Sequence, residues 1–193
     1  CKIIEGGIPS VGRNNGAKAA CGDLLLFLDS DVALPENFLK NNIEEFNQRM
    51  LSTASPVFKP LSDKTADKFL HRAYNTWAKA MQYSYPYGGG CCIFCKKETF
   101  EKTGGFNEKL LIAEDHDFVN RSRHYGKFRI LKNIPILVDI RRLEKEGRFV
   151  LVKKYLKGAL HRTFKGEMLE PPFEYELNGG VEVTEEYKKI NSH

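Results

Sequence analysis

Two aspartates that lie two residues apart are the first candidates for chemistry in this sequence. Asp29 and Asp31 flank Ser30 directly after the apolar run Leu24–Leu28. Along an extended backbone, such side chains point to the same side, with about 6.6 Å between their Cα atoms. Mg²⁺ and Mn²⁺ prefer oxygen ligands, commonly one or two carboxylates together with substrate phosphates. The pair therefore indicates a divalent-cation site, with a solvated turn or a cap of the next helix as the alternative interpretation.

A second acidic group stands at the start of a segment with helical spacing. Its residues are Glu114-Asp115-His116-Asp117. A carboxylate that borders a ligand cleft can act as a general base toward a hydroxyl. The helix dipole alone also favours acidic side chains in a first turn, so a purely structural role is the alternative.

Basic residues at two places suit a ligand that carries phosphate. Arg13 and Asn14 begin a predicted helix, whose N-terminus favours anions, and helix capping is the alternative. Arg141 and Arg142 can add charge-assisted hydrogen bonds to the same phosphates, or serve only as a solubilising pair.

A glycine run followed by cysteines marks another segment. Gly88, Gly89 and Gly90 permit close approach of a ligand to the backbone, with a plain turn as the alternative. In Cys91-Cys92-x-x-Cys95 the C-x-x-C spacing suggests zinc, but no second Cys or His pair follows at ligand distance. We therefore expect these cysteines to be small apolar residues of a buried strand.

The elements that must position these residues alternate along the chain, which indicates an α/β fold. The run Leu24–Leu28 is apolar at every position, as in a strand buried on both faces of a mostly parallel sheet. Hydrophobic spacing and Gly/Pro punctuation predict strands at 1–5, 24–28, 55–61, 88–94, 128–131 and 136–140. They predict helices at 11–20, 35–50, 66–82, 97–103 and 114–125.

Composition limits the function classes. The 193 residues carry a net charge of +5 and are 41% hydrophobic, which is ordinary for one globular domain. No dense Lys/Arg stripe is present, so we do not expect nucleic-acid binding. Five cysteines in this clustered arrangement do not resemble a secreted disulfide framework, which favours a reducing, cytoplasmic location. No apolar run is long enough for a transmembrane helix, and no signal peptide is visible.

Three blocks of the sequence together resemble the family 2 glycosyltransferases, which are inverting enzymes with the GT-A fold. The first block is Gly12-Arg13-Asn14-Asn15-Gly16-Ala17, followed by Ala20-Cys21-Gly22-Asp23 and Phe27-Leu28-Asp29-Ser30-Asp31. The second is Gly104-Gly105-Phe106-Asn107-Glu108, followed by Ala113-Glu114-Asp115-His116-Asp117 and Arg121. The third is Arg141-Arg142 with Gly147 shortly after.

The resemblance implies a metal-dependent transfer from a nucleotide-diphosphate sugar, a UDP- or GDP-sugar, to a glycan or polyprenyl-phosphate acceptor. It implies Mn²⁺ or Mg²⁺ at Asp31, with Asp29 on the metal or the ribose. It implies Asp115 as the base, with Asp117 as the alternative. His161 would be a third metal ligand, or else a surface histidine.

The resemblance also implies a Rossmann-like, mixed but mostly parallel sheet with helices on both faces, in a catalytic domain over residues 1–147. Members of the family begin with a β-α-β portion that holds the nucleotide base. Because nothing like it precedes Cys1, we expect that portion to be missing here. Residues 148–193 then form a basic amphipathic helix and a polar tail that flank the domain.

The segment 148–165 interleaves apolar residues with Lys and Arg and lacks Asp and Glu. Such a helix can lie in a membrane interface, here at the inner face of the membrane near a lipid-linked acceptor. The alternative is that its apolar face only packs on the domain.

Other function classes fit parts of this pattern. A nucleotidyltransferase of related fold also uses Asp-bound Mg²⁺, and a D-x-D phosphatase would use its first Asp as the nucleophile. A degenerate domain that only binds at a membrane surface is the non-enzymatic alternative.

Overall fold

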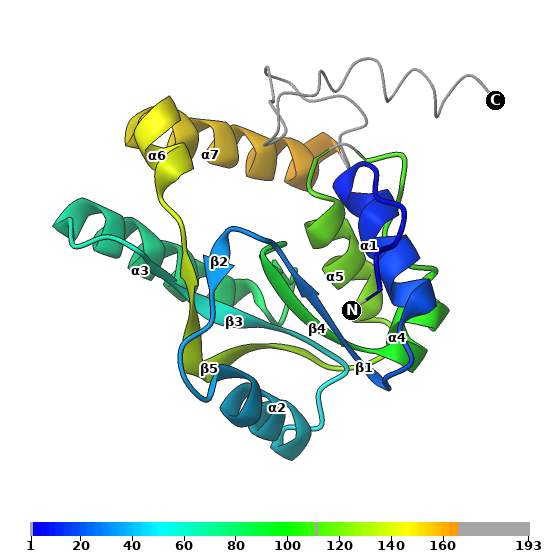
Figure 1. Cartoon of the computed structure of the whole chain (residues 1–193). Coiled ribbons are helices and arrows are strands. Elements are labelled where there is room, and N and C mark those ends of the chain that lie inside the picture. The colour runs from blue at the N-terminus through cyan, green and yellow to red at the C-terminus, as the bar shows by residue number, and fades with distance from the viewer. Residues whose placement is uncertain (1, 111, 166–193) are drawn as a thin grey trace.

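A five-stranded mixed sheet forms the centre of the computed structural model, which describes residues 2–110 and 112–165 (Figure 1). The strand order is β1-β4-β3-β5-β2. The strands are β1 (Leu24–Leu28), β2 (Val32–Ala33), β3 (Thr53–Pro60), β4 (Cys92–Lys96) and β5 (Phe128–Val138). The helices are α1 (Pro9–Ala19), α2 (Phe38–Gln48), α3 (Thr65–Met81), α4 (Lys97–Thr103), α5 (Glu114–Ser122), α6 (Arg141–Glu146) and α7 (Arg148–Lys165).

Strand directions confirm a mixed α/β sheet. Strand β3 pairs in parallel with β5 and antiparallel with β4, and β4 pairs antiparallel with β1. Strands β1, β3 and β5 therefore run in one direction, and their carboxyl ends meet at one edge of the sheet. Because β4 separates β1 from β3 and β2 pairs antiparallel with β5, three of the four described pairings are antiparallel, so the sheet is mixed rather than mostly parallel.

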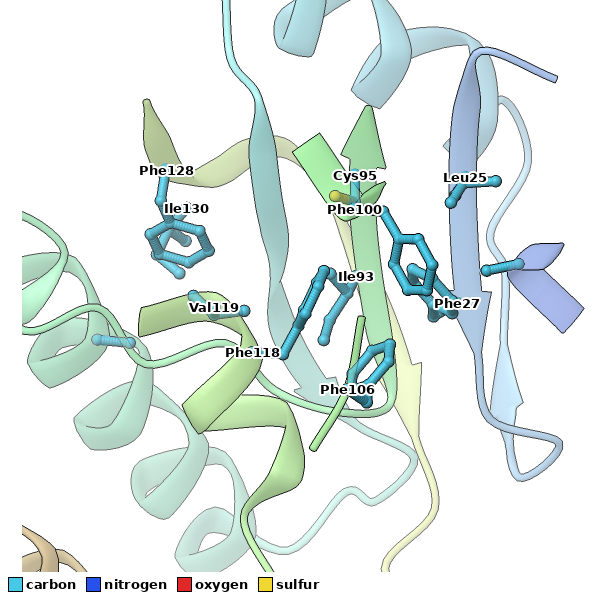
Figure 2. Close-up of a cluster of buried hydrophobic side chains, with 12 residues drawn as sticks. Leu25, Phe27, Ile93, Cys95, Phe100, Phe106, Phe118, Val119, Phe128 and Ile130 are labelled. Carbon is cyan, nitrogen blue, oxygen red and sulfur yellow. The ribbon is translucent and has the colours of Figure 1, made fainter. Parts of the chain in front are cut away.

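Helices cover both faces of the sheet, as expected. One core contains Leu25 and Phe27 of β1 together with aromatic residues of the helical layer, Phe100, Phe106 and Phe118 (Figure 2). The rings of Phe106 and Phe118 stack with 4.3 Å between their centroids. The second core lies on the opposite face, where α2 packs on β3, β4 and β5.

The side chains of β4 alternate between the two cores, and this explains the cysteines. Cys92 belongs to the core beneath α2, whereas Cys95 belongs to the core beneath α1, α4 and α5. Both are buried free thiols, and burial raises the pKa of Cys95 to about 12. Because they project to opposite faces, Cys92 and Cys95 cannot share one metal ion, which agrees with a buried strand.

Several strand predictions differ from the structure. The strand predicted at 88–94 is β4, which begins only at Cys92, and β2 was not predicted. Residues 2–5 have no regular structure, since no strand in the described part of the chain pairs with them; Cys1 lies outside that part. The strands predicted at 128–131 and 136–140 are two halves of β5, separated by a register shift opposite β3. The amides of Lys132 and Asn133 there donate to the Glu45 carboxylate, at 2.8 and 2.9 Å, which keeps the irregular segment attached to α2.

The start of one helix differs from the prediction because of the local backbone conformation. Helix α2 begins at Phe38 rather than Pro35, because Asn37 adopts a left-handed conformation (φ 59°). Helix α6, which begins with the paired arginines, was not predicted.

The C-terminal helix α7 is attached to α3 through an ion pair. Arg148 donates to both carboxylate oxygens of Asp67, at 2.6 and 3.0 Å, and the Asp67 side chain is inaccessible to solvent. Leu151 is buried beside it. Within residues 2–110 and 112–165, none of the helices has the length and apolarity that a bilayer crossing requires. The polar tail predicted at the C-terminus lies outside the described residues from 166 onward.

Candidate active site

The candidate site lies at the sheet edge where β1 ends. Asp29 follows the last residue of β1, and its backbone nitrogen donates to the carbonyl of Cys91 at 3.1 Å. Because β4 runs antiparallel to β1, the glycines that precede β4 lie at this same edge. Ligands of open α/β sheets bind at such carboxyl ends.

Arg13 of α1 joins three parts of this edge. Its Nη2 atom lies 2.9 Å from Oδ1 of Asp29 and 3.2 Å from the carbonyl oxygen of Gly90. Its Nη1 atom lies 2.5 Å from Oε1 of Glu114. The guanidinium also lies 5.4 Å from the ring centroid of Phe106, and 14% of the side chain is exposed. Arg13 therefore holds the first aspartate of the pair and the start of α5 together.

Asp115 is fixed by backbone amides. The backbone nitrogen of Gly90 lies 2.6 Å from its Oδ2 atom, and that of His116 lies 2.8 Å from its Oδ1 atom. A Cβ atom at Gly90 would stand 2.7 Å from Oδ2 of Asp115, and one at Gly89 would stand 1.9 Å from the Phe58 ring. The glycine run is therefore required by close packing on both sides rather than by a turn alone.

The acidic cluster strongly perturbs its own ionisation. Burial raises the pKa of Glu114 to about 7, the neighbouring charge of Asp115 adds to this, and Arg13 opposes it. Burial also raises the pKa of Asp29 against the pull of Arg13. For Arg13, burial lowers the pKa, but the charges of Glu114, Asp29 and Asp115 outweigh it and the net direction is upward. Perturbed groups that gather in one place are typical of functional sites.

Asn14, unlike Arg13, points toward the loop that follows α4 and not toward Asp29. Its amide nitrogen donates to the carbonyl of Phe106 at 2.9 Å and to Oε1 of Glu108 at 2.7 Å, while its Oδ1 accepts from the Phe106 amide at 2.8 Å. Its side chain thus attaches the 105–108 loop to α1.

Asp117 likewise bonds within the protein. Its Oδ2 atom accepts from Nε and Nη2 of Arg121, at 2.9 and 2.6 Å. Arg121 in turn donates to the carbonyl oxygens of Thr103 and Gly105 at 2.7 and 2.9 Å. Of the two candidate bases, Asp115 contacts the glycine run at the sheet edge and Asp117 organises the connection after α4.

The paired arginines lie at the same sheet edge but after β5, three strands away from β1. That separation is about 14 Å, at about 4.8 Å per strand. Arg141 pairs with Asp139, with Nε 2.6 Å from Oδ2, and Arg142 pairs with Glu146 at 2.8 Å. Both guanidinium groups thus have a carboxylate partner within the protein.

The metal candidates form an open rather than a closed set. Asp31 is exposed, and 41% of the Asp29 side chain is exposed. Across residues 2–110 and 112–165, no three His, Cys, Asp or Glu side chains gather closely enough to hold a metal ion alone. His161 of α7 is therefore not assembled with Asp29 and Asp31 into a three-ligand site. Two carboxylates that leave the other positions to water and substrate phosphate suit Mg²⁺ or Mn²⁺.

Glu114 is the site residue that the sequence interpretation left without a role. The available signal was its place in the acidic group directly before Asp115. Its partner Arg13 stands 101 residues earlier, so only the fold shows the contact.

A mixed sheet with an Asp-x-Asp pair after its first strand and a carboxylate at the same edge is compatible with the GT-A fold, which the solved structures below share. The chain belongs to glycosyl transferase family 2, whose profile matches residues 5–108. That match includes Arg13, Asp29, Asp31 and Gly90, and ends before Glu114 and Asp115. No curated protein matches the chain.

Solved structures share the fold at low sequence identity. The mannosyltransferase PcManGT from Pyrobaculum calidifontis, in complex with GDP-Man and Mn²⁺, superposes with a TM-score of 0.53 and 19% identity, over 67% of this chain and 35% of that one. S. aureus TarS 1–349 in complex with UDP-GlcNAc superposes with a TM-score of 0.52 and 17% identity, over 69% of this chain and 39% of that one. The structure of S. aureus TarS superposes with a TM-score of 0.54 and 16% identity, over 82% of this chain and 32% of that one. The matched region therefore spans about a third to a half of the chains of PcManGT and TarS.

Proposed function

We propose that this protein transfers a sugar, with inversion, from a nucleotide-diphosphate sugar to a hydroxyl or lipid-phosphate acceptor, with the help of a divalent cation. The observation that carries the proposal is the position of Asp115, held by the Gly90 amide at the edge where Arg13 holds Asp29. Membership of family 2 and the nucleotide sugars bound by PcManGT and TarS support the donor class.

The proposed base is Asp115. With a hydroxyl acceptor, inversion needs a base that deprotonates this hydroxyl as it attacks the anomeric carbon opposite the leaving group. Both Asp115 oxygens accept backbone hydrogen bonds, which fix the plane of the carboxylate. Each carboxylate oxygen has a second lone pair, so Asp115 can still accept the acceptor's proton.

Asp29 and Asp31 are the proposed cation ligands. A Mg²⁺ or Mn²⁺ ion bound there would supply Lewis-acid neutralisation of the departing diphosphate. Arg13 keeps Asp29 at the sheet edge, and Gly90, which is only partly buried, holds Asp115 beside it. Gly89 is buried against the Phe58 ring, so we assign it no contact with the donor. Arg141 and Arg142 would have to exchange their carboxylate partners for phosphate before they could contribute.

Release of nucleoside diphosphate tests this function. We expect the protein to release it from a UDP- or GDP-sugar with Mn²⁺ or Mg²⁺, and to stop when the metal is chelated. Asp31→Asn should abolish release, whereas Glu44→Gln, which removes an exposed carboxylate on α2, should not. Full activity of Asp31→Asn would contradict the metal assignment, and release of pyrophosphate would indicate a nucleotidyltransferase instead.

We also propose that α7 contacts the cytoplasmic face of an anionic membrane. Phe149 is 93% exposed, and Val150 and Leu156 are also exposed. By helical spacing, Phe149 and Leu156 lie on the side of α7 opposite the buried Leu151. Exposed Lys153 adds positive charge, and anionic lipid attracts basic residues by about 1 kcal/mol each.

Flotation with vesicles tests that contact. We expect the protein to float with phosphatidylcholine/phosphatidylglycerol vesicles and less with phosphatidylcholine alone. The double variant Phe149→Ser/Leu156→Ser should lose flotation, whereas Leu39→Ser, at an exposed position on α2, should retain it. Equal flotation of all variants would place the membrane contact outside α7, and no flotation of the unmodified protein would show that α7 only packs on the domain.

A further inference from the structure

A basic groove lies beside β3, outside the site described above. It is formed by residues 57–60 of β3 and by one face of α3, which presents Lys68, His71, Arg72, Asn75, Thr76 and Lys79. Its volume is about 320 Å³, which is enough for a small-molecule group or one unit of a larger ligand.

The charge of this groove is of one sign. Lys59, Lys68, Arg72 and Lys79 line it, together with His71, and no carboxylate does. Lys68 pairs with the exposed Asp63 at 3.1 Å. Within the part of the chain that the structure describes, no carboxylate pairs with Lys59, Arg72 or Lys79. Three cations therefore remain available to an anion.

The nearest acidic residue of α3 does not offset this charge. Asp67 is fully buried and accepts hydrogen bonds from Arg148 at 2.6 and 3.0 Å and from Ser62 at 2.6 Å. Its charge is compensated on the side of α3 that faces α7. The positive groove and the buried acid are thus separate features of the same helix.

A side-chain clamp fixes the width of the groove. Asn75 donates to the carbonyl of Phe58 at 2.8 Å and accepts from its amide at 2.9 Å. These bonds occur directly after the register shift between Pro56 and Phe58 in the pairing of β3 with β5. Because α3 is held to β3 in this way, the cations do not have to be brought together when a ligand binds.

The groove adjoins the glycine run of the candidate active site. Phe58 lines the groove, and its ring fills the space that a Cβ atom of Gly89 would occupy. The next residue, Gly90, donates to Asp115. The groove is at the carboxyl end of β3, on the same sheet edge as Asp29, so a ligand anchored there can extend toward Asp115.

We propose that the basic groove binds a phosphate ester carried by the acceptor, and so orients a separate hydroxyl of that acceptor toward Asp115. Arg72 suits a phosphate because its planar fork can donate two parallel hydrogen bonds, while Lys59 and Lys79 add point charges. The diphosphate of the donor is assigned to the separate Asp29 and Asp31 pair. The inference rests on the proposed glycosyl transfer for its substrate class, but anion binding itself can be measured without turnover.

Direct binding measurements test the groove. The soluble probe is glucose 6-phosphate, followed by calorimetry; the lipid probe is phosphatidylcholine vesicles with and without polyprenyl phosphate. We expect the protein to bind at least one of them, and the probe that binds identifies the source of the phosphate. The double variant Arg72→Gln/Lys79→Gln should weaken binding by about tenfold or more, since hydrogen bonds to charged groups are among the strongest available.

A matched pair of variants controls for lost charge. Lys40→Gln/Lys132→Gln removes the same charge from exposed positions on α2 and β5 and should leave binding unchanged. Lys59 lines the groove from strand β3, and Lys59→Glu replaces its positive charge with a negative one. This variant should weaken binding more than the Arg72→Gln/Lys79→Gln variant does. The inference is overturned if neither probe binds, if the groove variants bind as the unmodified protein does, or if the control loses as much affinity.

Donor hydrolysis separates this inference from the proposed function. The groove variants should release nucleoside diphosphate from the donor alone at the normal rate, because they leave Asp29, Asp31 and Arg13 intact. If the unmodified protein releases none but still binds glucose 6-phosphate in the groove, glycosyl transfer fails and the anion site stands. If release is normal and neither probe binds, the groove inference alone fails.

Discussion

The backbone nitrogen of Gly90 lies 2.6 Å from Oδ2 of Asp115, and this contact connects the start of β4 with the start of α5. The carbonyl oxygen of the same glycine accepts from Arg13 at 3.2 Å. Gly90 thus links the candidate base on one side with the arginine that holds Asp29 on the other. The geometry of the candidate site depends on this one peptide segment.

Gly90→Ala should reduce transfer without unfolding the protein. The new Cβ atom would stand 2.7 Å from the Asp115 carboxylate, so this side chain must move. A displacement of about 1 Å can lower a rate by about a hundredfold. Steady-state kinetics and the thermal midpoint report the two effects separately. Gly16→Ala in α1 is the control, because its Cβ would meet no atom within 4 Å and alanine favours a helix by about 0.5–1 kcal/mol.

Asp115→Asn should lower activity, whereas Asp117→Asn should lower stability. Loss of a general base lowers turnover by about 100- to 10,000-fold, and we expect this for Asp115→Asn with donor affinity retained. Asp117 accepts two hydrogen bonds from Arg121, so Asp117→Asn should lower the free energy of unfolding by about 1–3 kcal/mol. Arg121→Gln should resemble Asp117→Asn in denaturation experiments. An inactive, fully stable Asp117→Asn beside an active Asp115→Asn would reverse the assignment.

Glu114 should make stability depend on pH near neutrality. Burial, together with Asp115, raises its pKa to about 7 in the folded protein, from an ordinary value of 4.5. Between these values the folded state holds a proton that the unfolded state has released. The free energy of unfolding should therefore fall as pH rises from about 4.5 to about 7 and then level off.

Urea denaturation at several pH values measures this dependence. Glu114→Gln, which cannot ionise, should lose less stability over the same range, and Glu44→Gln should behave as the unmodified protein does. Parallel pH profiles for all three proteins would exclude Glu114 as the titrating group.

The ion pair of Asp67 with Arg148 should hold α7 in place. Hydrogen bonds from Arg148 and Ser62 lower the pKa of Asp67 to about 2, so its stabilisation is present above its ordinary pKa of 3.8 and is lost as pH falls through about 2. Arg148→Gln leaves a buried carboxylate without its cation and should lower the thermal midpoint and speed tryptic cleavage within α7. Lys153→Gln, at an exposed position on α7, should change neither the midpoint nor cleavage elsewhere in the helix.

Much of the fold could be predicted because burial leaves a pattern in the sequence. The run Leu24–Leu28 is apolar throughout, and the structure places Leu25 and Phe27 in one core and Leu24 and Leu26 against the other. The helical spacing of Phe38 and Phe46 similarly corresponds to one buried face of α2. These elements depend on local periodicity, which residue types alone record.

The strand predicted at residues 1–5 is absent from residues 2–5, and the prediction divided β5 into two strands. Both errors have the same physical reason. Strand formation requires a hydrogen-bonded neighbour, and the identity of that neighbour is not a local property. Residues 2–5 have no such neighbour in the described chain. Strand β5 continues past its irregular segment because β3 and Glu45 of α2 satisfy its backbone on both sides.

The sequence by itself determined the family, the Asp29 and Asp31 pair after a buried strand, and the acidic group at the start of α5. Only the tertiary structure placed Arg13 between Asp29 and Glu114, and attached Asp115 to Gly90. The physical reason is that each contact joins residues whose separation along the chain carries no information about distance. It arises where the end of β1, the start of β4 and the start of α5 meet at one sheet edge.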